Sequence, residues 1–152
     1  MNQIFDCIEV IDKIFDNWEM CVDYVKEVFV GKNWATEEYF EFIKKDLIEN
    51  DSYMVLTPHI VLLHSAPNHG ALENRFYIAK LITSVNFNHE LNDPVQIVMA
   101  FTAVDEKEHI GAIQKLALMM LEPDFLTSLL SANNQIELST VLKQFESKER
   151  ND

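Results

Sequence analysis

The ten residues from 95 to 104, VQIVMAFTAV, constrain the fold more than any other stretch of the chain. A strand with one face in solvent alternates apolar and polar side chains, whereas this run is almost entirely apolar. We therefore expect a strand that is buried on both faces, which requires further layers of structure packed above and below it.

Helices that could supply those layers are predicted before and after this strand. Asp105 follows the strand directly and, with Glu108 three residues later, has the pattern of a variant capping box. Asn17 and Thr36 are suited to cap two earlier helices. The five predicted helices cover residues 17–30, 37–50, 105–122, 124–131 and 135–146.

The other strands are predicted from shorter apolar runs. Residues 53–57 and 60–63 are separated by Pro58, and residues 75–87 are rich in β-branched and aromatic side chains. A short first strand is predicted near residues 8–11. This order of elements predicts an α/β (α+β) chain in which one sheet is covered by helices on both faces.

Length and composition indicate one cytoplasmic domain. With 152 residues and 48% hydrophobic content, the chain has enough apolar material for a single domain at residues 1–146, followed by a frayed tail at 147–152. No run of about 18 apolar residues is present, which argues against direct insertion into a membrane. The N-terminus does not resemble a signal peptide, and Cys7 and Cys21 are interpreted as buried thiols.

The formal net charge of −13 bears on the choice of partners. Nucleic acid binding needs a basic surface for the phosphates, so we do not expect nucleic acid as a partner. An acidic surface suits a basic protein partner through electrostatic steering, although it also serves solubility alone.

Three of the five histidines, His59, His64 and His69, lie five residues apart within residues 57–70, TPHIVLLHSAPNHG. This spacing separates neighbours on a strand and on a helix, so we do not expect a shared metal ion. A serine-nucleophile triad is not expected either, because Ser65 lies outside any GxSxG pattern. No metal and no organic cofactor is predicted.

A single histidine acting as a nucleophile is the chemistry that remains. His64 ends the apolar run 60–63, so the end of a strand would present its ring, and the chain after it is turn-like. An imidazole with a pKa of about 6.5 is largely neutral in the cytosol and can attack phosphorus. His109 is predicted in the first turn of a helix, where unpaired N–H groups favour a nearby phosphate. Without further context, a surface or core role is the commoner one for either histidine.

Four segments occur in a characteristic order along the chain. A tryptophan-bearing helix (DNWEMCVDYV) precedes a tyrosine-bearing helix (TEEYFEFIKK), then YMVLTPHIVLLHSAPNHG, then FTAVDEKEHIGAIQKLALMML. In this order they resemble the enzyme IIA components of the bacterial phosphoenolpyruvate sugar phosphotransferase system. The resemblance is to the mannitol/fructose type, and within it to the ascorbate-like branch, and it covers roughly residues 8–145.

This resemblance implies a mannitol-type enzyme IIA fold, a three-layer α/β/α sandwich with a small mixed β-sheet. It implies that His64 is the phosphorylated residue and that His109 is a second active-site histidine. It also implies partners: the phosphocarrier HPr would donate the phosphoryl group, and a cysteine of an enzyme IIB component would accept it during sugar uptake. The sequence leaves open which sugar is carried and whether the chain forms a homo-oligomer.

The sequence departs from the family pattern around His64. Leu63 stands where the family has a proline, His59 where it has a small residue, and Ala66 where it has an arginine. A guanidinium at that position could bind phosphoryl oxygens in a bidentate way, and alanine cannot. This absence supports an alternative, a regulatory or protein-interaction module of the same fold with weak or lost phosphotransfer.

Several residues are candidates to compensate for the missing arginine. We expect His59, Ser65 and His69 as possible neighbours of a phosphate at His64, and loop N–H groups as donors to its oxygens. Arg75 and Lys80 are further candidates if the fold brings them close.

Overall fold

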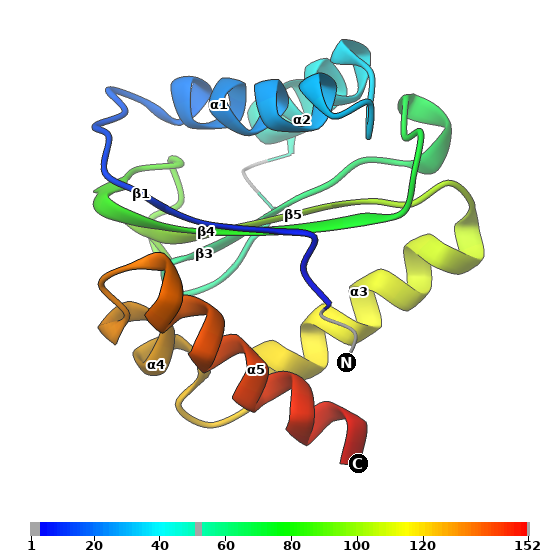
Figure 1. Cartoon of the computed structure of the whole chain (residues 1–152). Helices are drawn as coiled ribbons and strands as arrows, with labels where there is room; N and C mark the ends of the chain where they lie inside the picture. The colour runs from blue at the N-terminus through cyan, green and yellow to red at the C-terminus, as the bar shows by residue number, and fades with distance from the viewer. Residues whose placement is uncertain (1–3, 51–52, 152) are drawn as a thin grey trace.

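A computed structural model describes residues 4–50 and 53–151. The strands are β1 (Cys7–Ile11), β2 (Val55–Thr57), β3 (Ile60–Leu63), β4 (Arg75–Val85) and β5 (Val95–Thr102). The helices are α1 (Trp18–Gly31), α2 (Glu37–Glu49), α3 (Glu106–Leu121), α4 (Phe125–Ser131), α5 (Gln135–Asn151) and the short 3-10 helix η1 (Pro67–His69). The sheet lies between α1 and α2 on one face and α3, α4 and α5 on the other, which confirms the three-layer α/β/α sandwich (Figure 1).

The sheet is mixed and has β5 at its centre. The strand order is β1-β4-β5-β3-β2, in which β5 runs antiparallel to β4 and parallel to β3. β5 is buried along nearly its whole length, as its apolar sequence predicted. Because Leu63 of β3 is level with Ala100 of β5, the carboxyl ends of these two parallel strands lie side by side.

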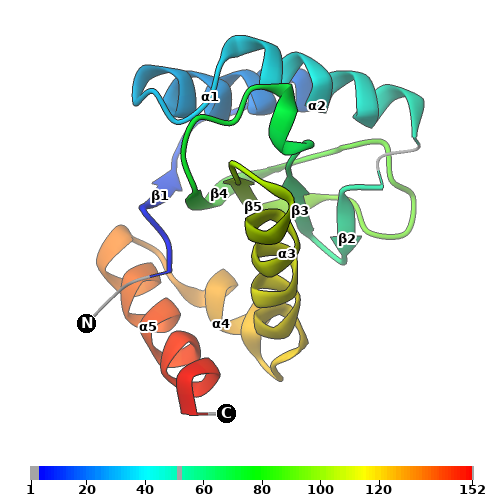
Figure 2. The same ribbon diagram turned by 90° about the vertical axis from the view of Figure 1, so that its right-hand side faces the viewer.

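The alternation of side chains divides the interior into two cores. Leu62 and Phe101 belong to the core on the α3–α5 side of the sheet, whereas Leu63 and Ala100 belong to the core on the α1–α2 side. His64 follows Leu62 by two residues and continues on its face, toward α3. The fold thus directs the predicted nucleophile to the same side of the sheet as α3, the helix that carries the second predicted histidine. α3 lies on the opposite side of the sheet from α1 and α2 (Figure 2).

Two of the predicted helix caps form as expected. The side-chain oxygen of Asn17 accepts a hydrogen bond from the N–H of Met20, and Asp105 accepts one from the N–H of Glu108. Thr36 precedes α2 as predicted, but its hydroxyl makes no capping hydrogen bond. These local signals therefore located the helix starts, including the start of α3 beside the candidate site.

Several element boundaries differ from those predicted. β2 begins only at Val55, and β5 ends at Thr102 rather than at residue 104. α5 continues to Asn151, beyond the predicted end at residue 146, and Asp152 of the predicted tail lies outside the described residues. None of the helices in the described part of the chain is long and apolar enough to cross a membrane.

Candidate functional site

The ring of His64 lies in a cluster of other rings at the end of β3. It stacks nearly parallel to Phe101 of β5, with centroids 5.3 Å apart and an interplanar angle of 13°. The ring of His109 lies 5.9 Å from that of His64, and Tyr53 approaches edge-on at 6.0 Å. His64 is only 9% exposed. The fold therefore brings together the two histidines that were singled out in the sequence, which lie 45 positions apart.

A backbone hydrogen bond fixes the orientation and tautomer of His64. Its Nδ1 lies 2.9 Å from the carbonyl oxygen of Leu62. Because a carbonyl oxygen only accepts, Nδ1 must carry the hydrogen, and Nε2 of the neutral ring keeps its lone pair. Burial lowers the pKa of His64 below its ordinary value, while the hydrogen bond to Leu62 opposes this shift. The site therefore favours a neutral imidazole with Nε2 as a nucleophile.

His109 supplies a second ring nitrogen with unsatisfied hydrogen-bonding capacity. It follows the N-cap of α3, and its backbone N–H donates to the carbonyl of Asp105 at 2.9 Å. Its ring lies 5.4 Å from Phe101, so both histidines pack against the same aromatic side chain. Its Nδ1 is buried and has no hydrogen-bond partner among the described residues. A buried polar atom without a partner, next to the predicted nucleophile, is characteristic of functional sites.

The N-terminus of α3 is surrounded by more acidic side chains than a simple phosphate-binding site would have. Glu106 and Glu108 lie in the first turn, after the acidic cap Asp105. These carboxylates stabilise the helix through its dipole and so compete with a bound anion for the same partial charge. The helix end is therefore a weaker anion site than its position alone predicted.

Ser65 and His69 form a hydrogen-bonded pair directly after His64. The hydroxyl oxygen of Ser65 lies 2.6 Å from Nδ1 of His69, whose ring stacks on Phe42 of α2 at 3.7 Å. The chain returns through η1 and then through Gly70, which has φ of +128°. A Cβ atom at Gly70 would lie 2.1 Å from the Thr36 hydroxyl, so only glycine fits there.

His59 is not brought to this cluster. It lies before β3, whereas His64 lies after it, so roughly 16 Å of extended chain separates them. Its Nδ1 donates to the carbonyl oxygen of Pro94 at 2.7 Å. The expectation that His59 would neighbour a phosphate on His64 is therefore corrected: His59 belongs to the opposite end of the strand.

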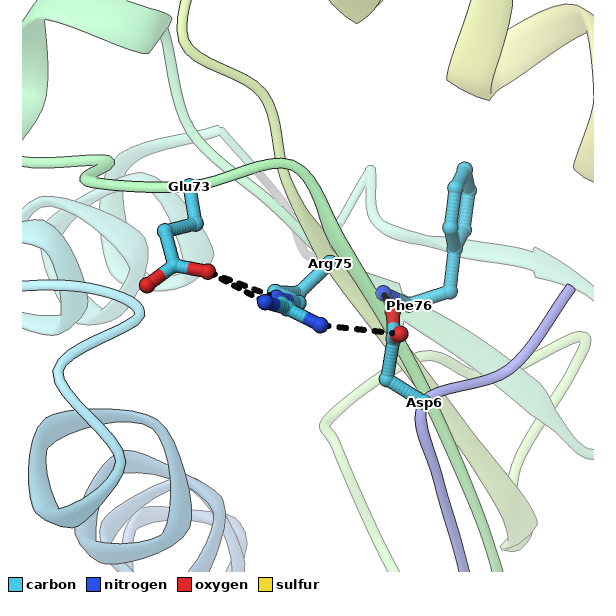
Figure 3. A network of polar contacts seen from close by, with 4 residues as sticks. All are labelled: Asp6, Glu73, Arg75 and Phe76. Atoms are coloured by element: carbon cyan, nitrogen blue, oxygen red, sulfur yellow. Dashed lines mark hydrogen bonds and ion pairs between the residues drawn. The ribbon is translucent and has the colours of Figure 1, made fainter.

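The two cations considered as replacements for the missing arginine are also held elsewhere. Arg75 makes ion pairs with Glu73 and Asp6, one on each side of its guanidinium (Figure 3), and lies 5.3 Å from the ring of Trp34. Lys80 donates to backbone carbonyl oxygens at the C-terminal end of α4. Both side chains are thus engaged in structural contacts with other groups.

Sequence reasoning did not identify the aromatic residues of the site. In the sequence, Tyr39 was recognised only as the tyrosine of a predicted helix, but in the structure its hydroxyl contacts the backbone of Ser65 and of Phe101. Phe101 was predicted only as part of a buried strand. The available signal was the single phenylalanine of β5 and the aromatic residues of α2, but only the strand register shows which of them face His64.

The predicted absence of a metal site can be compared with the geometry. Within residues 4–50 and 53–151, no group of three or more histidine, cysteine, aspartate or glutamate side chains could hold a metal ion.

Two curated relatives are similar to this chain over most of its length. The mannitol-specific cryptic phosphotransferase enzyme IIA component of Escherichia coli (strain K12) is 30% identical, over 90% of this chain and 92% of the relative. The ascorbate-specific phosphotransferase EIIA component of Shigella boydii is 29% identical, over 72% of this chain and 73% of the relative.

Solved structures with the same fold include relatives of the same kind. The solution structure of the mannitol-specific cryptic enzyme IIA from E. coli has a TM-score of 0.77 and 26% identity, covering 95% of both chains. The complex of mannitol enzyme IIA with phosphorylated enzyme IIB, also from E. coli, has a TM-score of 0.70 at 16% identity. It covers 90% of this chain and 94% of that one, and shows the shared fold.

The family assignment rests on residues 5–145, which include β1, the whole sheet and nearly all the helices. These residues match the family described as "Phosphoenolpyruvate-dependent sugar phosphotransferase system, EIIA 2". The expected resemblance is thereby confirmed, and the chain belongs to the EIIA 2 family of the phosphoenolpyruvate-dependent sugar phosphotransferase system.

Proposed function

We propose that this protein is a cytoplasmic phosphoryl carrier for sugar uptake. It would accept a phosphoryl group from the phosphohistidine of HPr on Nε2 of His64 and pass it to a cysteine of an enzyme IIB component. The observation that carries this proposal is the buried His64 ring, whose Nδ1 donates to Leu62 while Nε2 keeps its lone pair. The complex of the E. coli mannitol enzyme IIA, which has the same fold, with phosphorylated enzyme IIB supports the choice of partner.

The transfer balances without a cofactor. The lone pair of His64 Nε2 forms a bond to phosphorus as the bond between phosphorus and the donor's ring nitrogen breaks, and that nitrogen keeps the electron pair. The hydrogen stays on Nδ1, which continues to donate it to the Leu62 carbonyl oxygen, so no proton has to move. In the onward step a thiolate of the acceptor attacks phosphorus, and Nε2 recovers its lone pair. Such transfer depends on positioning and on stabilisation of the phosphoryl oxygens.

Two side chains are proposed to stabilise those oxygens. His109 contributes the ring nitrogen Nδ1, which has no hydrogen-bond partner within the described part of the chain. The hydroxyl of Ser65, which is hydrogen-bonded to His69, is the other polar group of the predicted set that lies beside His64. The N–H of Ser65 is not available, because it donates to the Tyr39 hydroxyl.

Phosphorylation in a reconstituted system tests this proposal. Phosphoenolpyruvate, enzyme I and HPr should transfer an acid-labile, base-stable phosphate to the protein, and added enzyme IIB should remove it. Replacing His109 with alanine should slow labelling about a hundredfold, by loss of one stabilising group. Absence of labelling, or an acid-stable phosphate, would contradict the proposal.

A second candidate function is favoured by the electrostatics of the site. Ala66 offers no charge, and Arg75 and Lys80 are held by other groups. Weak stabilisation of the phosphoryl group would suit a regulatory or protein-interaction module that is phosphorylated only as a signal. In one outcome, the protein is labelled and yet passes phosphate only slowly to every enzyme IIB component of the same cell. That result would favour this function over transport.

A further inference from the structure

The hydroxyl of Tyr39 occupies the junction between the ends of β3 and β5. It accepts a hydrogen bond from the N–H of Ser65 at 3.0 Å. It lies 2.9 Å from the carbonyl oxygen of Phe101 and 3.2 Å from that of Ser65, so its single proton has two acceptors. Tyr39 is 1% exposed, and burial raises its pKa, so the hydroxyl remains a donor at any physiological pH.

This hydroxyl takes the place of the backbone ladder where the ladder stops. The registered pairing of the two strands ends with Leu63 opposite Ala100. Beyond that pair, Ser65 and Phe101 are joined through the oxygen of Tyr39 instead of through each other. The side chain therefore sets how far the two strands separate at this end of the sheet.

His64 lies between the last paired residue and the residue held by Tyr39. Its ring stacks on Phe101, whose backbone is held by the same hydroxyl. One oxygen atom, contributed by α2, thus connects the segment that carries the nucleophile to the strand that carries the ring beneath it. None of the contacts of Tyr39 involves the His64 imidazole itself, so its influence is indirect.

We propose that Tyr39 is a positioning residue for His64, holding Nε2 in line for phosphoryl transfer by joining Ser65 to Phe101. The expected effect of Tyr39 on the rate rests on the proposed phosphoryl carrier function, whereas its expected effect on the structure around His64 does not. Because a misplacement of about 1 Å can cost about a hundredfold in rate, removal of one hydroxyl is expected to lower the rate without removing the nucleophile.

A matched pair of substitutions separates positioning from general loss of stability. Tyr39→Phe removes this hydroxyl, and Tyr77→Phe removes another buried hydroxyl, which donates to Glu9 at 2.6 Å and makes no contact with the residues of the site. We expect both variants to lose stability. Only Tyr39→Phe should lower the rate of His64 phosphorylation at saturating phospho-HPr, by about tenfold to a hundredfold, with the KM for phospho-HPr nearly unchanged.

The structural effect is read from the unphosphorylated protein by NMR. In Tyr39→Phe, the ring nitrogens of His64 should lose the single Nδ1–H tautomer, whereas Tyr77→Phe should retain it. An unchanged tautomer and rate in Tyr39→Phe, or equal losses in both variants, would overturn the inference. If the wild type is not phosphorylated, the carrier function fails, and the tautomer comparison alone decides the inference.

If Tyr39→Phe does not fold, hydrogen exchange of the wild-type protein provides the test. The amide of Ser65 should be protected to a degree similar to the paired amides of β3. Exchange at the rate of an exposed loop amide would show that the junction is open and would overturn the inference.

Discussion

The two ends of β3 present the same residue type in opposite ways. At the carboxyl end, His64 is buried against Phe101 and His109 and keeps Nε2 free of the hydrogen bond made by Nδ1. At the amino end, His59 has φ of +70° and bonds through its ring to Pro94. The comparison teaches that the neighbours supplied by the fold, rather than the spacing of histidines, decide which of them is suited to chemistry.

The backbone of His59 gives it a structural role. Its N–H donates to the carbonyl of Asn92 at 2.8 Å, and its carbonyl accepts from the N–H groups of Gln96 and Ile97. The residue thereby joins the start of β3 to the loop before β5. The ring of His59 thus has a structural role at the amino end of β3, whereas the ring of His64 at the carboxyl end is proposed to carry the phosphoryl group.

The largest expected effect distinguishes these two histidines directly. His64→Ala should abolish phosphorylation by phospho-HPr, because no other group supplies the nucleophile. His59→Ala should be labelled at nearly the wild-type rate. Labelling is measured by acid-labile phosphate, with circular dichroism to show that both variants are folded. Loss of labelling in His59→Ala alone would reverse the assignment of the two ends.

A second substitution should affect only the amino end of β3. The Asp93 carboxylate accepts hydrogen bonds from the N–H groups of Phe87 and His89, both at 2.8 Å. Asp93→Ala would remove both hydrogen bonds and should destabilise the protein by about 1–3 kcal/mol. Urea unfolding measures this change. The rate of phosphorylation, assayed at a temperature where the variant is folded, should stay unchanged.

The carboxyl end should show its own dependence of stability on pH. Burial lowers the pKa of His64 in the folded state, so below about pH 6.5 the unfolded chain binds more protons at this residue. Its contribution to stability is present above that pH and decreases as the pH falls toward the folded-state pKa. Unfolding between pH 7.5 and 5 measures this loss. His64→Gln should lose less stability over that range than the wild type, and an equal loss would contradict the expectation.

The smallest expected effect concerns the charge next to the site. Burial is the main cause that lowers the pKa of His64, and the Asp46 carboxylate is a weaker influence in the opposite direction. Asp46→Asn should therefore lower the pKa of His64 slightly further, as measured by NMR titration. Glu49→Gln, which removes an exposed carboxylate from the same helix, serves as the control and should leave the titration curve in place.

Local patterns predicted much of the fold, and long-range contacts account for what they missed. Asn17 and Asp105 mark helix starts through chemistry within three residues, and the central strand is recognisable from its own apolar side chains. The predicted strand 60–63 already placed His59 and His64 at opposite ends of one strand. His59 could lie near His64 only if the chain reversed between them, and the structure shows no such reversal.

The surroundings of His64 could not be predicted in the same way. Tyr39 reaches backbone atoms 26 and 62 positions away, and Arg75 pairs with Asp6 across two neighbouring strands. Such contacts depend on strand order and register, which a single sequence does not specify. The family resemblance supplied the pairing of His64 with His109, but not the rings that hold them.

The hydrogen bond from His64 to the carbonyl of Leu62 also decides which of two chemical isomers can form. With Nδ1 occupied, phosphorylation on Nε2 produces τ-phosphohistidine, and the π isomer would require this bond to break first. The donor and acceptor lie only two residues apart, on the last residues of β3 and the residue that follows it, so the selection is made before any partner binds. The backbone of β3 thereby shields Nδ1 from phosphorylation. The NMR coupling between phosphorus and the ring nitrogens would identify the isomer.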